Sequence, residues 1–185
     1  MSLHAIRTKI MVLGSRDFRE ADRMIVGYSP EYGLLELLAK GSRKSVSKLA
    51  PLLGCLTLVD AMIIRGKKFD VFASGMLIDG YEDIKGSYMN FMACQYAGAL
   101  IQQYTAQGEY ENNIFVHLLE FVENIRGKEE ISRERIEHCV EDFKNKILHA
   151  GGWIDQSDYT RPIDYGYHFP SSYKAVSLQE YFYGI

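Results

Sequence analysis

The spacing of apolar residues changes near residue 80, and this change restricts the folds that the chain can adopt. Before residue 80, apolar and other residues alternate, as they do in strands with one buried face. After residue 81, apolar residues recur every three or four positions, as they do along amphipathic helices. The sequence therefore predicts an α+β protein in which strands come first and helices follow.

Five strands are predicted before this boundary. They cover residues 6–12, 23–28, 34–39, 55–65 and 69–78, with a polar break at 14–21 and a short helix at 49–53. Pro30 and Gly33 supply turn geometry after the second strand, and Gly66 does so after the fourth. Five strands with a helical insertion after the third predict a small closed barrel, of which the OB-fold is the best-known example.

Three helices and an aromatic tail are predicted after the boundary. The helices cover residues 87–107, 114–125 and 132–150, with Ser132 as an N-cap. Tyrosine and phenylalanine crowd residues 153–185, which we interpret as irregular chain lying over the helices. We therefore expect two domains: an OB-fold nucleic-acid-binding domain at 1–80, and a helical domain with a Tyr-rich C-terminal tail at 81–185.

The charge of the chain is distributed unevenly between these two parts. The whole chain carries a net charge of -3, which by itself argues against a nucleic-acid-binding protein. Residues 1–80, however, hold 12 Lys and Arg against 8 Asp and Glu, a net charge of +4. Residues 81–185 hold 9 against 16, a net charge of -7. This division indicates a basic binding module joined to an acidic body.

The densest group of cations lies in residues 40–49, called the basic loop below. It contains Lys40, Arg43, Lys44 and Lys48, and no acidic residue occurs between Glu36 and Asp60. Glycine and serine fill the spaces between the cations, so the backbone can approach a phosphate closely while the long side chains supply charge. A solvated surface turn with no binding role is the alternative interpretation.

Other cations of the predicted barrel also fall in loops and at strand ends. The candidate DNA-binding residues are Arg16, Arg23, Lys40, Arg43, Lys44, Lys48, Arg65, Lys67 and Lys68, with Arg19 nearby. Tyr28, Tyr32 and Phe69 are candidates for base stacking. Packing inside the barrel is the alternative for these rings, and it is the favoured interpretation for Phe69.

No catalytic, metal or cofactor motif is recognisable. Three separated cysteines form no C-x-x-C pair, five histidines lack metal-ligand spacing, and neither a Walker A nor a G-x-S-x-G motif occurs. We interpret Glu20 and Asp22 as local ion-pair partners of Arg19 and Arg23 rather than as an acid–base pair. We expect no enzymatic activity, no cofactor, no metal, no signal peptide and no membrane span, and the unpaired cysteines suit a reducing compartment.

Several short segments together resemble a known family. Residues 16–23 read R-D-F-R-E-A-D-R, residues 31–34 read E-Y-G-L, residues 39–43 read A-K-G-S-R, and residues 47–49 read S-K-L. In order and spacing they resemble the N-terminal domain of the bacterial RecO recombination mediators, over about the first 80 residues. The resemblance implies an OB-fold in which Lys40 and Arg43 contact phosphates, with Arg16 and Arg23 close by.

The resemblance also implies a function in DNA repair. Proteins of this family bind single- and double-stranded DNA and anneal complementary strands. With RecR they assist loading of RecA onto strands covered by the single-stranded DNA-binding protein, in the bacterial cytoplasm and at the nucleoid. The alternative is a protein-interaction adaptor of the repair machinery whose DNA affinity is incidental.

One feature of the family has no counterpart in this sequence. Many members carry a four-cysteine zinc module in the C-terminal domain, and this chain has only Cys55, Cys94 and Cys139. The chain either belongs to a branch without zinc or carries a different module in that place.

Overall fold

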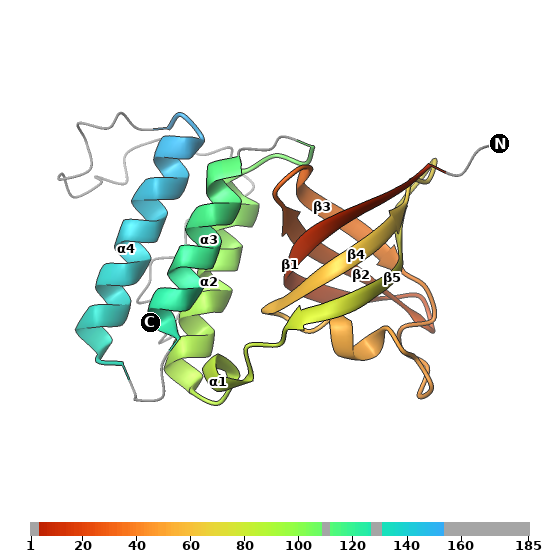
Figure 1. Ribbon diagram of the computed structural model, residues 1–185, viewed down its shortest axis with the longest axis horizontal. Coiled ribbons are helices and arrows are strands. Elements are labelled where there is room, and N and C mark those ends of the chain that lie inside the picture. The colour runs from red at the N-terminus through yellow and green to blue at the C-terminus, as the bar shows by residue number, and fades with distance from the viewer. Residues whose placement is uncertain (1–3, 109–111, 127–130, 154–185) are drawn as a thin grey trace.

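The computed structural model describes residues 4–108, 112–126 and 131–153, and it places a β-barrel beside a group of helices (Figure 1). The predicted α+β order, strands before helices, is confirmed. The predicted aromatic tail, apart from Trp153, lies outside the described residues.

Five strands close into a barrel in the order β1-β2-β3-β5-β4. The strands are β1 (Ala5–Phe18), β2 (Asp22–Ser29), β3 (Gly33–Ala39), β4 (Thr57–Ile64) and β5 (Asp70–Asp79), with the short 3-10 helix η1 (Ala50–Leu52) between β3 and β4. Neighbouring strands are antiparallel except β3 and β5, which pair in parallel and close the ring. The predicted OB-like barrel is therefore confirmed, including its helical insertion.

The first strand is longer than predicted, because the expected polar break at 14–21 was wrong over most of its length. β1 runs on to Phe18 and pairs with β4 along its first half and with β2 along its second. A register shift between Val12 and Gly14 marks a bulge, where one extra residue interrupts the alternation of faces. After the bulge the strand is exposed and polar, so its sequence looks like a loop.

Within the described residues, four helices follow the barrel, one more than predicted. They are α1 (Glu82–Lys85), α2 (Tyr88–Tyr104), α3 (Asn112–Ile125) and α4 (Arg133–Ala150). The predicted cap is confirmed, because the hydroxyl of Ser132 accepts a hydrogen bond from the Arg135 backbone N–H. Helix α1 is a single turn, too short to produce a recognisable stripe of apolar residues.

Two hydrophobic cores hold the chain together. One fills the barrel and includes Ile10, Ile25 and Phe72. The other joins the helices to the outer face of the barrel, where Met11 and Tyr28 belong to the same cluster as residues of α2, α3 and α4. Strand β1 therefore contributes to both cores, with Ile10 facing inward and Met11 facing the helices.

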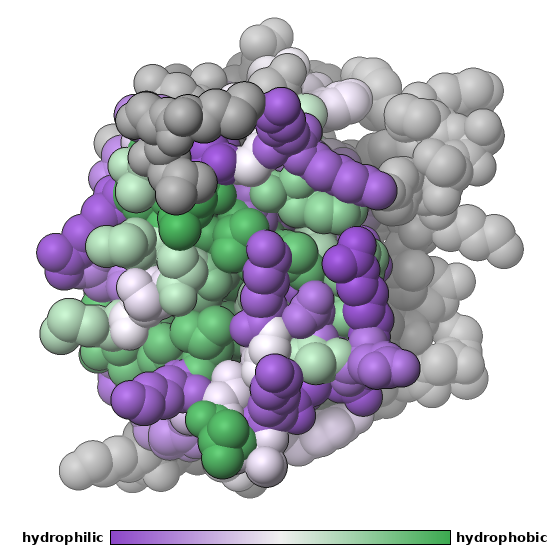
Figure 2. Space-filling view, turned by 90° about the vertical axis from the view of Figure 1, so that its right-hand side faces the viewer, coloured by the Kyte–Doolittle hydropathy of each residue, from purple (hydrophilic) through white to green (hydrophobic). Residues whose placement is uncertain are grey.

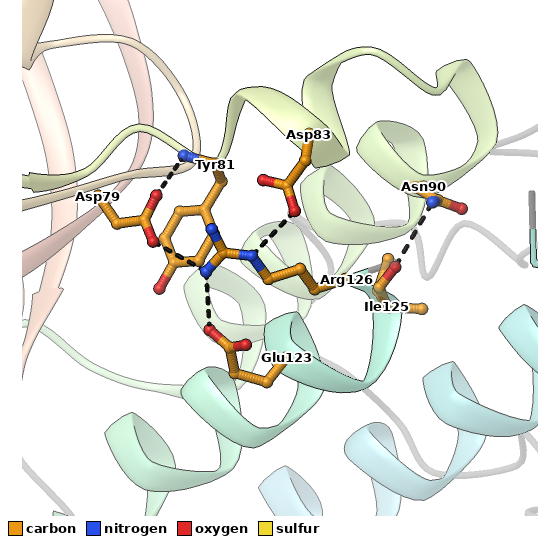
Figure 3. Close-up of polar contacts among 7 residues, drawn as sticks. All are labelled: Asp79, Tyr81, Asp83, Asn90, Glu123, Ile125 and Arg126. Carbon is orange, nitrogen blue, oxygen red and sulfur yellow. Dashed lines mark hydrogen bonds and ion pairs between the residues drawn. The ribbon is translucent and has the colours of Figure 1, made fainter. Parts of the chain in front are cut away.

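A polar joint links the end of β5 to α1 and α3 (Figure 3). The guanidinium of Arg126 donates to Asp79 and to Asp83, each at 2.9 Å, and to Glu123 at 3.2 Å. It also lies over the ring of Tyr81, 5.2 Å from the centroid. Burial raises the pKa of Tyr81 to about 12. One side chain thus ties three segments of the chain at the junction of barrel and helices.

Candidate nucleic-acid interface

The basic loop is held in a defined conformation by hydrogen bonds to the β1–β2 hairpin. The Gly41 backbone N–H donates to Asp22 Oδ1 at 2.8 Å, and the Arg43 backbone N–H donates to the Ala21 carbonyl at 2.9 Å. Gly41 has a φ of +65°, in the left-handed region that glycine adopts without a steric penalty. The backbone of the loop is therefore held in place at residues 41–43. A solvated turn with no binding role has no need of such anchoring.

Two of the predicted arginines converge on one carboxylate at the β1–β2 hairpin. Asp17 lies 3.5 Å from Arg23 and 3.2 Å from Arg43, and the Arg43 side chain also donates to the Arg19 carbonyl. The loop and the hairpin therefore present their cations side by side. Arg16, in contrast, pairs with Glu36 of β3 at 2.6 Å.

A ring contact brings the β4–β5 turn (residues 65–69) to the same hairpin. Phe18 and Phe69 meet edge to face with centroids 5.6 Å apart. Arg19 lies over the Phe18 ring and Lys68 over the Phe69 ring, at 5.1 and 5.5 Å from the centroids. Three connections distant in sequence thus meet on the part of the barrel away from the helices (Figure 1).

The lysines and the arginines of this surface differ in how they are held. Lys40, Lys44, Lys48 and Lys67 are exposed, and none has an ion-pair partner within the described residues. Arg16, Arg23, Arg43 and Arg65 each pair with a carboxylate. Exposed pairs of this kind are worth only about 0–1 kcal/mol, so a phosphate can replace the carboxylate at little cost.

The three aromatic candidates have different surroundings. Tyr28 is fully buried in the core shared with the helices, so the prediction that it could stack on a base was wrong. Tyr32 is half-buried, with Arg65 lying 5.2 Å from its ring centroid. Phe69 is half-buried against Phe18 and belongs to neither core cluster, so packing inside the barrel was the wrong interpretation for it.

The interpretation of Glu20 and Asp22 was also wrong in detail. Asp22 accepts from the Gly41 backbone, and the ion pair of Arg23 is made by Asp17 instead. Nothing short-range in the sequence indicates these partners, because Asp22 and Gly41 are 19 positions apart.

Sequence reasoning missed two cations on the outer face of β1. Arg7 and Lys9 are exposed there, at positions that alternate with the buried Thr8 and Ile10. The Arg7 guanidinium donates to both carboxylate oxygens of Asp60 of β4, which lowers the pKa of that carboxyl. Lys9 has no ion pair within the described residues. The alternation of polar and apolar residues along β1 could have identified them, since it places both side chains on the exposed face of the strand.

Exposed apolar side chains of β4 and β5 are called the apolar strip below. Its members, all exposed, are Met62, Met76, Leu77 and Ile78. Figure 2 shows apolar side chains gathered on one part of the barrel's free end, with hydrophilic side chains along the rest. The barrel therefore offers two kinds of surface, one cationic and one apolar.

The described residues contain no arrangement typical of covalent catalysis. Burial raises the pKa of Cys55 and of Cys94, so these thiols are held protonated and unreactive. In the part of the chain that the structure describes, no three His, Cys, Asp or Glu side chains are grouped to hold a metal ion. Nor is any helix there both long and apolar enough to cross a bilayer.

Comparison with known proteins shows which sequences this chain resembles. Residues 1–81 match the family model described as "Recombination protein O N terminal". The chain is similar to proteins named "DNA repair protein RecO" from Desulforamulus reducens, 30% identical over 57% of this chain, and from Clostridium acetobutylicum, 24% identical over 83% of it. A RecO protein of Dehalococcoides mccartyi is 25% identical over 81% of it.

These relatives are longer than the matched part of the chain. The chain spans 41%, 60% and 57% of the proteins from Desulforamulus, Clostridium and Dehalococcoides, respectively. The family model matches the barrel, and the matches to the Clostridium and Dehalococcoides proteins extend well beyond it. Two of the four segments that carried the resemblance, residues 16–23 and 39–43, are joined by the hydrogen bonds between the basic loop and the β1–β2 hairpin. The barrel part of the chain therefore matches the N-terminal domain of RecO proteins, and the chain as a whole is similar to them.

Proposed function

We propose that this chain is a mediator of DNA repair and recombination that binds single- and double-stranded DNA through the cations of its barrel. The observation that carries the proposal is the basic loop, which holds Lys40, Lys44 and Lys48 exposed and without ion pairs to the described residues while its backbone is fixed by Asp22 and Ala21. A preformed loop loses little conformational entropy when a strand binds. Its affinity comes from release of counterions and does not depend on base sequence.

The site in this proposal comprises all nine predicted cations. Lys40, Lys44, Lys48 and Lys67 supply charge directly, and Arg23, Arg43 and Arg65 exchange weak carboxylate pairs for phosphates. Arg16, in β1, and Lys68, in the β4–β5 turn, complete the set. The barrel at 1–80 is then the DNA-binding domain, and the remainder at 81–185 forms a second domain.

We further propose that the protein anneals complementary strands and, together with RecR, helps to load RecA onto strands covered by the single-stranded DNA-binding protein in the bacterial cytoplasm. Support comes from the match of residues 1–81 to the N-terminal domain of RecO proteins and from the similarity of the chain to proteins named DNA repair protein RecO. Binding both strands mainly through phosphates suits annealing, because the base edges stay available for pairing. The proposed activity is non-covalent, with neither a cofactor nor a catalytic residue.

Salt-titrated binding of oligonucleotides tests this function. We expect Lys44→Ala with Lys48→Ala to weaken binding of a single strand and to reduce the slope of log K against log salt by about 1.4, since each phosphate contact contributes about 0.7. Arg133→Ala with Arg135→Ala, on α4, removes the same charge far from the loop and should leave the slope unchanged. Equal slopes for both double variants and the parent protein would contradict the proposed surface.

A protein-interaction adaptor is the second candidate function, and the apolar strip favours it. Four large apolar side chains are exposed on adjacent strands, whereas an ordinary surface exposes such residues singly and scattered. Met76→Ser with Leu77→Ser would then abolish capture of purified RecR while the protein shows no shift of bare DNA. Retained DNA binding with full salt dependence would favour the mediator instead.

A further inference from the structure

The tip of the basic loop carries an apolar side chain that DNA binding through phosphates alone does not use. Val46 is 86% exposed, the largest exposed fraction among the exposed large apolar residues of the described chain. It lies in the sequence Lys44-Ser45-Val46-Ser47-Lys48, midway between two lysines that have no ion pair within the described residues. The basic loop is anchored by hydrogen bonds to Asp22 and Ala21, so the exposure of Val46 belongs to a defined loop conformation.

The backbone places Val46 at the corner of a tight turn. The Ser47 N–H donates to the Lys44 carbonyl at 2.9 Å, which makes Ser45 and Val46 the two central residues of a four-residue turn. The Lys44 N–H in turn donates to the Gly41 carbonyl at 3.2 Å, so the turn continues from the anchored entry of the loop. Val46 therefore projects from a preorganised support, and its branched side chain has little rotamer freedom to lose.

We propose that Val46 is an apolar wedge that packs against an unstacked nucleobase while Lys44 and Lys48 hold the phosphates on either side of it. Proteins that distort or separate base steps commonly insert one apolar side chain between them. Single strands already expose base faces, so the contact favours single-stranded over double-stranded DNA. This inference rests on the proposed function of the basic loop.

Basic residues around an apolar tip also suit a lipid surface, but the small apolar area that Val46 offers disfavours this partner. A whole myristoyl chain gives only marginal membrane binding. One valine side chain buries far less apolar area than such a chain. A base face, in contrast, is small enough for one branched side chain to cover part of it.

The test compares Val46→Ser with Val46→Ile in the full chain, using a single-stranded oligonucleotide that contains 2-aminopurine, whose fluorescence reports base unstacking. We expect Val46→Ser to weaken single-strand binding about threefold to tenfold, to leave the salt slope unchanged, and to lose the fluorescence change. Val46→Ile should retain all three properties. Val116→Ser, at an exposed apolar position on α3, is the matched control and should behave as the parent protein does.

The outcomes separate this inference from the proposed function. If the parent protein binds DNA with the Lys44 and Lys48 salt dependence but Val46→Ser binds equally well with the same fluorescence change, the wedge is refuted and the proposed function stands. If the parent protein shows no DNA binding, both fail. Loss of binding to vesicles of anionic phospholipid in Val46→Ser, with DNA binding intact, would overturn the wedge in favour of a lipid contact.

Discussion

At the scale of single residues, the site depends on long-range partners that the sequence does not display. The four cations of the basic loop are evident in the sequence, but the acceptor that anchors the loop is Asp22, and its bond to Gly41 spans the whole of β2 and β3. Local charge alternation suggested instead that Asp22 pairs with an arginine beside it. The cations that we propose to bind DNA are therefore evident in the sequence, whereas the reason for their fixed positions required the fold.

Two glycines in the strands make a residue-scale prediction about stability. A Cβ atom at Gly27 of β2 would lie 2.3 Å from Ile10 Cγ2 and 3.0 Å from the Met11 carbonyl oxygen, whereas one at Gly14 of β1 would have nothing within 4 Å. We expect Gly27→Ala to destabilise the protein by about 1–3 kcal/mol through overpacking. Gly14→Ala should change stability by less than about 0.5 kcal/mol.

Denaturant unfolding monitored by circular dichroism measures both variants. The pair is matched, because both glycines lie in strands of the same barrel and neither has a positive φ. Similar unfolding midpoints for the two variants would contradict the close approach of β1 and β2 at Gly27.

At the scale of elements, regular periodicity was predictable and its interruptions were not. All five strands and the three long helices follow from the spacing of apolar residues. The second half of β1 was missed because the bulge at Val12 and Gly14 shifts the alternation and because the exposed strand that follows is polar. Helix α1 was missed because one turn cannot show a helical repeat.

The joint around Arg126 makes an element-scale prediction, since it ties β5, α1 and α3 (Figure 3). Arg126→Met keeps much of the side chain's packing but leaves Asp79, Asp83 and Glu123 without their shared cation. We expect a loss of about 1 kcal/mol near neutral pH, because the pairs are partly exposed and screened by solvent. Arg133→Met, which breaks an exposed pair within α4, should cost less.

The effect of Arg126→Met should also depend on pH. Burial alone would raise the pKa of Asp79, but the Tyr81 N–H and the Arg126 guanidinium outweigh it and lower the pKa below that of an unfolded aspartate. A carboxylate with a lowered pKa stabilises the fold above about pH 4 and loses that contribution as the pH falls through its folded-state pKa. Thermal unfolding of the parent and the variant should therefore converge in acid. A gap that stays constant down to pH 2 would show that Arg126 acts through packing alone.

At the scale of the whole molecule, the distribution of charge matters more than its sum. The net charge of -3 describes a protein that repels DNA, yet the cations gather on the barrel and the acidic excess lies in the remainder of the chain. Helix α4 lies on the side of the helices away from the barrel (Figure 1). At physiological ionic strength the Debye length is about 8 Å, so charges on α4 are screened from a strand bound at the basic loop.

Two substitutions with identical effects on net charge test this separation. Glu20 is exposed in the β1–β2 turn beside the basic loop, and Glu134 is exposed in the first turn of α4. We expect Glu20→Gln to tighten binding of a single-stranded oligonucleotide about two- to threefold at 0.1 M salt, because it removes a repulsive charge within reach of the phosphates. Glu134→Gln should leave the affinity unchanged, although it gives the same net charge.

Fluorescence anisotropy at several salt concentrations measures both affinities. The advantage of Glu20→Gln should shrink as salt is raised, since screening weakens the repulsion that the substitution removes. Equal gains for the two variants would mean that the strand responds to the total charge of the protein. A gain confined to Glu20→Gln means that the strand lies along the loops that the barrel brings together, and that the acidic helices are tolerated because they are out of range.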